Sequence, residues 1–167
     1  MIPATVTFYW SIVFVHVMAV VIGFGPTFVY PILWRAARNR YPRSFPALLR
    51  TQDRIGQFVI APAAILILLT GIYLVLSTAP QAAYDFDASF VKVAMPILVA
   101  LIIMGPLYFG RTESKLADLA ERDIAASTGA DVVLSEEFTR GLAQLTLVVR
   151  LANIAVLVAL FFMVVKP

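Results

Sequence analysis

Long apolar stretches alternate with shorter polar stretches along the chain. The apolar stretches cover about residues 7–34, 57–76, 90–109 and 142–165. An α-helix rises about 1.5 Å per residue, so each stretch can cross the roughly 30 Å hydrocarbon core of a bilayer. The pattern therefore predicts four transmembrane helices that form a single domain over residues 1–167.

The composition agrees with a lipid environment. Of the 167 residues, 61% are hydrophobic and only 14% are charged, whereas a soluble domain carries about 25% charged residues. One small core cannot hide this much apolar surface, so a lipid bilayer must cover much of it. We therefore predict an all-α integral membrane four-helix bundle. The chain has no cysteine, which excludes disulfides and thiol chemistry.

The charges of the connecting segments predict the orientation of the bundle. The segment 35–56 carries a single acid and the arginines Arg35, Arg38, Arg40, Arg43, Arg50 and Arg54. The second connection carries Asp85 and Asp87 and no basic residue. Since basic residues gather in cytoplasmic loops, segments 35–56 and 110–141 are predicted to be cytoplasmic, and the N-terminus and C-terminus both external. This bias also explains the net charge of +3 without a nucleic-acid partner.

The third connection has the pattern of a surface helix followed by a new helix start. Between Glu113 and Ala126, the residues Leu116, Leu119 and Ala120 lie on one stripe, with acids and bases elsewhere. Ser135 is predicted to be the N-cap of the helix that becomes the fourth span, because its hydroxyl can accept a hydrogen bond from a free backbone N–H.

Helix-breaking residues predict kinks in the first three spans. They are Gly23, Gly25 and Pro26, then Pro62 and Gly71, and finally Pro96, Gly105 and Pro106. A proline removes one backbone donor and clashes with the preceding turn. Kinks open space inside a bundle, which suits a bound cofactor, although they also occur in membrane helices that have no site.

His16 is the only histidine and the first candidate for chemistry. It lies about ten residues into the first span, near the middle of the bilayer. It shares a helix face with Ala19, Val20, Gly23 and Thr27, a strip of small residues that lets another helix or a flat cofactor approach closely. Imidazole is a common axial ligand of haem iron, so His16 is a candidate haem ligand. The alternative is a neutral histidine that is hydrogen-bonded across helices.

Two cations near the spans are further candidates. Arg150 lies inside the fourth span, with Asn153 on the same face at i+3. A haem propionate or an anionic substrate would pair with Arg150; alternatively, its side chain extends to the cytoplasmic head groups. Lys92 opens the third span on the external side, where a lysine that reaches water is the simpler interpretation. The methionines of the spans are interpreted as packing residues.

Other catalytic arrangements are missing from the sequence. It has no metal-ligand cluster, no Ser-His-Asp set, no Gly-rich phosphate loop and no pair of carboxylates at depth. Hydrolysis and phosphoryl transfer therefore have no basis here, and a transport pathway would need a more polar lining. Any chemistry in this chain requires a cofactor.

Three short motifs link the chain to known membrane proteins. They are Trp10, His16, Gly23, Pro26 and FVYP at 28–31; Arg54 with APAAILILLTG at 61–71; and RLAN at 150–153 with VVKP at 164–167. With these motifs the chain resembles a superfamily of small bacterial membrane proteins that includes the HemJ-type, haem b-containing protoporphyrinogen oxidases. It resembles more closely a related bacterial family of integral membrane proteins without a known function.

The resemblance implies roles for two residues and a location. His16 would be an axial ligand of haem b, and Lys92 would lie near the porphyrin or its substrate. The implied location is the bacterial cytoplasmic (inner) membrane, and the implied activity is that of an oxidoreductase resembling protoporphyrinogen oxidase. The chain departs from the oxidase pattern because segment 11–15 has no lysine, Ile154 stands where the oxidase has an acid, and the oxidase's further histidines are absent.

Two functions remain open on the sequence alone. In the first, the protein is a haem-binding membrane redox protein in which His16 holds the iron and Lys92, Arg150 and Asn153 contact the cofactor. The iron would be five-coordinate, or the same histidine of a second copy in a homodimer would complete it. In the second, the protein is a non-enzymatic accessory or scaffold subunit of a larger membrane complex, because small-residue strips and kinked helices also serve protein–protein packing.

Overall fold

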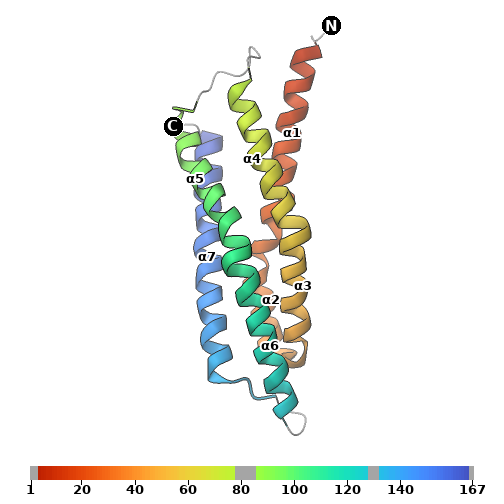
Figure 1. Cartoon of the computed structure of the whole chain (residues 1–167). Coiled ribbons are helices and arrows are strands. Elements are labelled where there is room, and N and C mark those ends of the chain that lie inside the picture. The colour runs from red at the N-terminus through yellow and green to blue at the C-terminus, as the bar shows by residue number, and fades with distance from the viewer. Residues whose placement is uncertain (1–3, 78–85, 128–131, 166–167) are drawn as a thin grey trace.

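The computed structural model describes residues 4–77, 86–127 and 132–165. Asp85, Lys166 and Pro167, which entered the sequence argument, lie outside these ranges. The described residues form four long antiparallel helical rods, and the first rod begins on the same side of the molecule where the last rod ends (Figure 1). Each rod is long and apolar enough to cross a membrane. The predicted all-α membrane four-helix bundle is confirmed.

Each of the first three rods is built from two α-helices with a tighter or wider turn between them. The first rod contains α1 (Ala4–Phe24), the 3-10 turn η1 (Gly25–Phe28) and α2 (Tyr30–Arg40), and the second follows the short turn η2 (Pro42–Ser44) and contains α3 (Phe45–Ile55), the π-helical turn η3 (Gly56–Ile60) and α4 (Ala61–Leu76). The third rod contains α5 (Ser89–Met104), the π-helical turn η4 (Gly105–Phe109) and α6 (Gly110–Ala126). The fourth rod is the single helix α7 (Glu136–Val165).

The turns inside the rods lie at the predicted helix breakers. Pro26 is part of η1, Pro62 is the second residue after η3, and Pro106 is part of η4. In η3 the N–H of Ala61 bonds to the carbonyl of Gly56, one residue farther back than in an α-helix. Proline lacks a backbone N–H, so the neighbouring groups shift to the wider register and the helix bends without ending. At Pro26, Pro62 and Pro106 the predicted break therefore coincides with a change in helix register, whereas Gly71 and Pro96 lie inside the α-helices α4 and α5.

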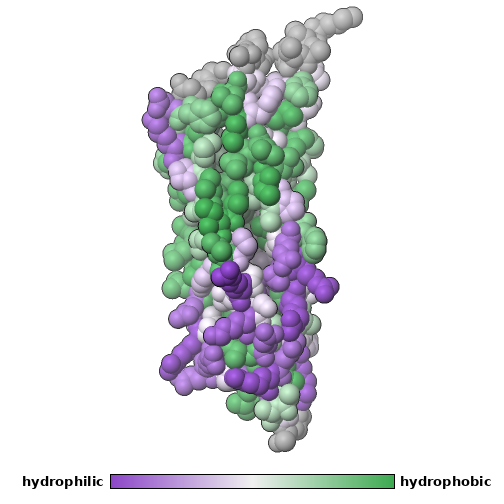
Figure 2. Space-filling view, viewed as in Figure 1, coloured by the Kyte–Doolittle hydropathy of each residue, from purple (hydrophilic) through white to green (hydrophobic). Residues whose placement is uncertain are grey.

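The rods are longer than a bilayer is thick. Their lengths run from 30 to 38 residues, which at about 1.5 Å per residue exceeds the roughly 30 Å hydrocarbon core. Figure 2 shows a mainly hydrophobic half, which includes α5, and a mainly hydrophilic half, which includes α6. The membrane-spanning part of the third rod thus ends near Phe109, and α6 lies beyond it. The segments 35–56 and 110–141, expected as connections, are largely helical and extend the bundle out of the lipid.

The extension has a hydrophobic core of its own. The core draws on all four rods and comprises Tyr30, Trp34, Ala37, Phe45, Leu49, Leu116, Ala117, Leu119, Ala120, Phe138, Leu142, Leu145 and Val149. Phe45 and Phe138 meet edge to face with their ring centroids 5.1 Å apart. Burial of this surface stabilises the extension in the way a soluble domain is stabilised, at about 25 cal/mol per Å² of apolar area. The apolar residues 142–149 therefore belong in part to this core, whereas the prediction assigned them all to the membrane.

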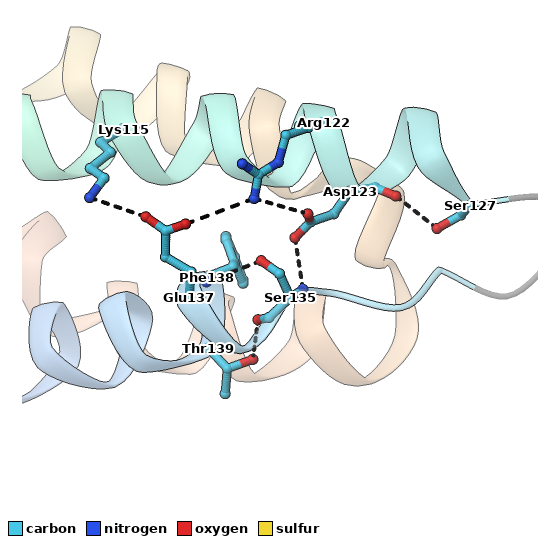
Figure 3. A network of polar contacts seen from close by, with 8 residues as sticks. All are labelled: Lys115, Arg122, Asp123, Ser127, Ser135, Glu137, Phe138 and Thr139. Atoms are coloured by element: carbon cyan, nitrogen blue, oxygen red, sulfur yellow. Dashed lines mark hydrogen bonds and ion pairs between the residues drawn. The ribbon is translucent and has the colours of Figure 1, made fainter.

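A polar network fixes the start of the fourth rod against α6 (Figure 3). The backbone N–H of Ser135 donates to Asp123 Oδ2 at 2.7 Å, and the Ser135 hydroxyl accepts from the backbone N–H of Phe138 at 3.3 Å. Glu137 bridges Lys115 and Arg122 of α6 at 3.3 and 3.9 Å. Ser135 is confirmed as the N-cap, and its own backbone is held by a buried acid of the neighbouring helix.

Candidate functional site

His16 lies on the side of α1 that faces α4 and is 9% exposed. Its Nδ1 is 2.8 Å from the hydroxyl oxygen of Thr70, and that hydroxyl is 2.6 Å from the carbonyl oxygen of Leu66. A threonine hydroxyl has one hydrogen, which the Leu66 carbonyl accepts one turn back. With its hydrogen on the Leu66 carbonyl, the Thr70 oxygen can accept a hydrogen bond from Nδ1–H of His16. In a neutral imidazole this leaves the lone pair on Nε2.

The small-residue strip beside His16 serves helix packing. A Cβ atom added to Gly23 would lie 2.9 Å from the Cβ of Ala63, so α1 and α4 are in close backbone contact there. Ala19, between His16 and Gly23, is also buried. Gly71 lies next to the imidazole, and a Cβ added to it would lie 3.4 Å from His16 Cε1. Of the two partners expected for the strip, the structure places a helix there.

A cavity of about 470 Å³ opens beside His16, and we call it the upper cavity. Its walls come from α1, α4, α5 and α7 and are mostly apolar: Tyr9, Val13, His16, Val17, Val20, Val21, Phe24, Ile67, Leu68, Gly71, Ile72, Leu74, Val75, Phe90, Val91, Ala94, Met95, Ile97, Leu98, Leu101, Val156, Ala159, Leu160, Met163 and Val164. The volume is in the range of small-molecule and cofactor sites. The imidazole is thus neither turned toward lipid nor sealed by its neighbours, as the haem hypothesis requires.

The structure does not bring the two candidate cations to this cavity. Lys92 pairs with Asp87 at 2.8 Å on the exposed surface, and it is not among the described residues that line the upper cavity. Arg150 follows Val149 of the hydrophobic core of the extension and is exposed. This position favours the alternative in which its side chain extends to the cytoplasmic head groups.

Asn153 is engaged with the kink of the first rod. Its side-chain nitrogen donates to the carbonyl of Thr27 at 3.2 Å, and its oxygen is 2.7 Å from the Thr27 hydroxyl. In an unbroken helix that carbonyl would accept from residue 31, but Pro31 has no N–H. The Asn153 amide therefore supplies the hydrogen bond that the proline removes, which gives this residue a structural task.

A second cavity of about 840 Å³, the lower cavity, lies where the apolar part of the rods meets the extension. The turns η3 and η4 both contribute to its walls, which are formed by Phe24, Thr27, Tyr30, Gln52, Asp53, Gly56, Gln57, Ile60, Ala61, Ala64, Ile65, Leu101, Ile102, Gly105, Pro106, Phe109, Gly110, Arg111, Glu113, Ser114, Lys115, Asp118, Val149, Ala152, Asn153 and Val156. Phe24, Leu101 and Val156 line both cavities. The two cavities therefore adjoin at these three apolar side chains.

Glu113 is a buried acid of the lower cavity that the sequence argument missed. It lies in α6 beyond the membrane-spanning part of the rod and is 5% exposed. Burial, together with the nearby negative charge of Asp53, raises the pKa of Glu113 to about 8. The sequence did carry a signal, because Glu113 begins the spacing that continues with Leu116, Ala117 and Ala120 on the buried face of α6.

The comparisons with known proteins identify a family and no function. No curated protein and no solved structure matches the chain. One family model, described as "Predicted integral membrane protein (DUF2269)", matches residues 11–167 and so includes His16, Thr70 and Glu113. A match over nearly the whole chain, on a fold with four membrane-crossing rods, agrees with that description. The protein therefore belongs to this family of predicted integral membrane proteins.

Proposed function

We propose that this protein binds haem b in the upper cavity, with His16 as an axial ligand of the iron. The observation that carries the proposal is a buried imidazole whose Nδ1–H is held by Thr70 while its Nε2 lone pair remains, next to an apolar cavity of about 470 Å³. Histidines that ligate metals generally donate their other N–H to a fixed acceptor in this way. When bound, haem b would supply one-electron redox chemistry within the membrane.

Besides the phenol of Tyr9, the other groups of ligand type in the cavity are sulfur atoms. Met95 of α5 and Met163 of α7 line the upper cavity together with His16. A thioether and an imidazole form a known pair of axial haem ligands. Either methionine is thus an alternative to a second histidine from a symmetric partner. Lys92 and Arg150 remain expectations from the sequence, and the geometry gives them no part in holding the cofactor.

An absorption spectrum of the purified protein tests the proposal. After expression in a bacterial host with ample haem, we expect a Soret band that co-elutes with the protein, and we expect His16→Ala to remove it while the protein remains folded. Lys92→Ala and Arg150→Ala are the matched controls and should keep the band, because both residues lie outside the cavity wall. A colourless wild-type protein would overturn the proposal. Stable co-purification with other membrane proteins would then favour the accessory-subunit alternative.

A further inference from the structure

Two buried polar atoms in the wall of the lower cavity have no hydrogen-bond partner among the described residues. They are the hydroxyl of Tyr30 and the side-chain nitrogen of Gln52. Tyr30 is 6% exposed and Gln52 is 2% exposed, and both line the lower cavity. A buried donor without an acceptor lowers stability, so native proteins rarely retain one without a use for it. Two such donors in one cavity indicate a ligand that supplies acceptors.

The identity of the free Gln52 atom follows from its neighbour. The indole nitrogen of Trp34 donates to Gln52 Oε1 at 2.7 Å. Because an indole nitrogen can only donate, the atom that it meets must be the amide oxygen. The NH₂ group of Gln52 is therefore the group left for a ligand, and Trp34 holds it in place from behind.

The charged groups around the cavity favour a neutral head group. The titratable or charged residues that line it are Tyr30, Asp53, Arg111, Glu113, Lys115 and Asp118. Asp118 is paired with Arg50, and Lys115 with Glu137. Asp53 accepts from Gln57 at 3.0 Å. The cations in the wall, Arg111 and Lys115, are both exposed, and the raised pKa of Glu113 favours a protonated carboxyl as a third donor. The interior therefore offers hydrogen bonds to acceptors and no buried cation for an anion.

The cavity also has room for an apolar tail. Its upper walls are apolar, and Phe24, Leu101 and Val156 connect it to the upper cavity within the membrane-spanning part of the bundle. A molecule with a polar head at the cytoplasmic end and a tail directed into the bilayer would match both regions. Burial of such a tail contributes affinity in proportion to its apolar area.

We propose that the lower cavity binds a neutral amphiphile whose head group carries carbonyl oxygens, with Tyr30 and Gln52 donating hydrogen bonds to them. Quinone carbonyls and the ester carbonyls of a glycerolipid share this chemistry. The site is separate from the imidazole of His16, so the proposal does not rest on haem binding.

Trp34 provides a direct readout of this site. The chain has two tryptophans, so Trp10→Phe leaves the indole behind Gln52 as the only one. Titration with decylubiquinone in a mild detergent should quench its fluorescence to saturation, because quinones quench a nearby indole. Dioctanoylglycerol, added to the quinone-bound protein, distinguishes the two sources. If the site takes glycerolipids, the ester displaces the quinone and the fluorescence of Trp34 recovers; if the site takes quinones only, the fluorescence stays quenched. Decylbenzene, which has a tail and a ring but no carbonyl, should not compete.

Tyr30→Phe separates recognition from structure. In the Trp10→Phe background, Tyr30→Phe should weaken the binding of decylubiquinone or dioctanoylglycerol by about 3- to 10-fold, as expected for one lost hydrogen bond. The ligand-free variant should be at least as stable as its parent, because an unpaired hydroxyl has been removed. Tyr41→Phe, at an exposed tyrosine outside the cavity, is the matched control and should change neither value. Absence of saturable binding by both probes, or unchanged affinity in Tyr30→Phe, would overturn the proposal.

Discussion

The imidazole of His16 owes its orientation to Thr70, whose hydroxyl hydrogen is already used by the carbonyl of Leu66. Thr70→Val keeps the shape of the side chain and removes the acceptor of Nδ1–H. If His16 is the haem ligand, we expect haem affinity to fall by about 10- to 100-fold, as for other partners of ligating histidines. A haem titration followed at the Soret band measures this. Thr70→Ser retains the hydroxyl and should bind nearly as the wild type does; equal losses in both variants would contradict this role of Thr70.

Glu113 predicts how stability depends on pH. Its pKa is raised from 4.5 to about 8 in the folded protein, so between these values the folded state keeps a proton that the unfolded state has lost. Stability should therefore fall as the pH rises through this window, with a slope of up to about 1.4 kcal/mol per pH unit from this group. Thermal unfolding in detergent at a series of pH values measures the slope. Glu113→Gln should flatten the slope of stability against pH, whereas Glu136→Gln, a control at an exposed acid, should leave it unchanged. A decline that persists in Glu113→Gln would contradict the assignment of the slope to Glu113.

At the scale of the elements, the kink of the first rod depends on α7. The Asn153 amide bonds to the Thr27 carbonyl that Pro31 leaves without a partner. Asn153→Ala should cost about 1 kcal/mol, which is typical of one interhelical hydrogen bond in a membrane protein. Pro31→Ala restores a backbone N–H, so the cost of Asn153→Ala should shrink in that background. A double-mutant cycle of unfolding free energies measures the coupling, and strictly additive effects would contradict the explanation.

The positions of the helix breakers were predictable, but the form of each kink was not. Proline spacing indicates where a backbone donor is lost, and η1, η3 and η4 lie at such places. Whether the helix tightens to a 3-10 turn or widens to a π-helical turn depends on contacts with other rods. The pairs His16–Thr70 and Thr27–Asn153 join residues far apart in sequence, so neither could be derived from local pattern.

At the scale of the molecule, the orientation predicted from the arginines awaits a test. Because the chain has no cysteine, single cysteines can be labelled without background. Ser89→Cys lies at the start of α5 and Asn39→Cys near the end of α2, on opposite sides of the membrane in this topology. We expect a membrane-impermeant maleimide to label the first in intact cells and the second only after permeabilisation. The opposite pattern would reverse the topology.

The spans followed from hydropathy, whereas the ordered extension beyond them did not. Hydropathy measures how readily a segment enters lipid. The sequences of α3 and α6 mix polar and apolar residues, so their hydropathy predicts connecting segments and not spans. Their order comes from packing between rods, in which Phe45, Leu49 and Phe138 bury against one another. The lower cavity depends on that packing. Tyr30, Gln52 and Glu113 could therefore not be named as candidates from the sequence, while His16, alone of its kind in an apolar span, could.

The Soret absorbance of wild type and His16→Ala, purified side by side in one detergent and compared at equal protein concentration, tests haem ligation by His16. We expect a haem band in the wild type and its loss in the variant, with the same elution volume for both proteins. A haem band of equal strength in both proteins, or none in a folded wild type supplied with haem, would contradict it.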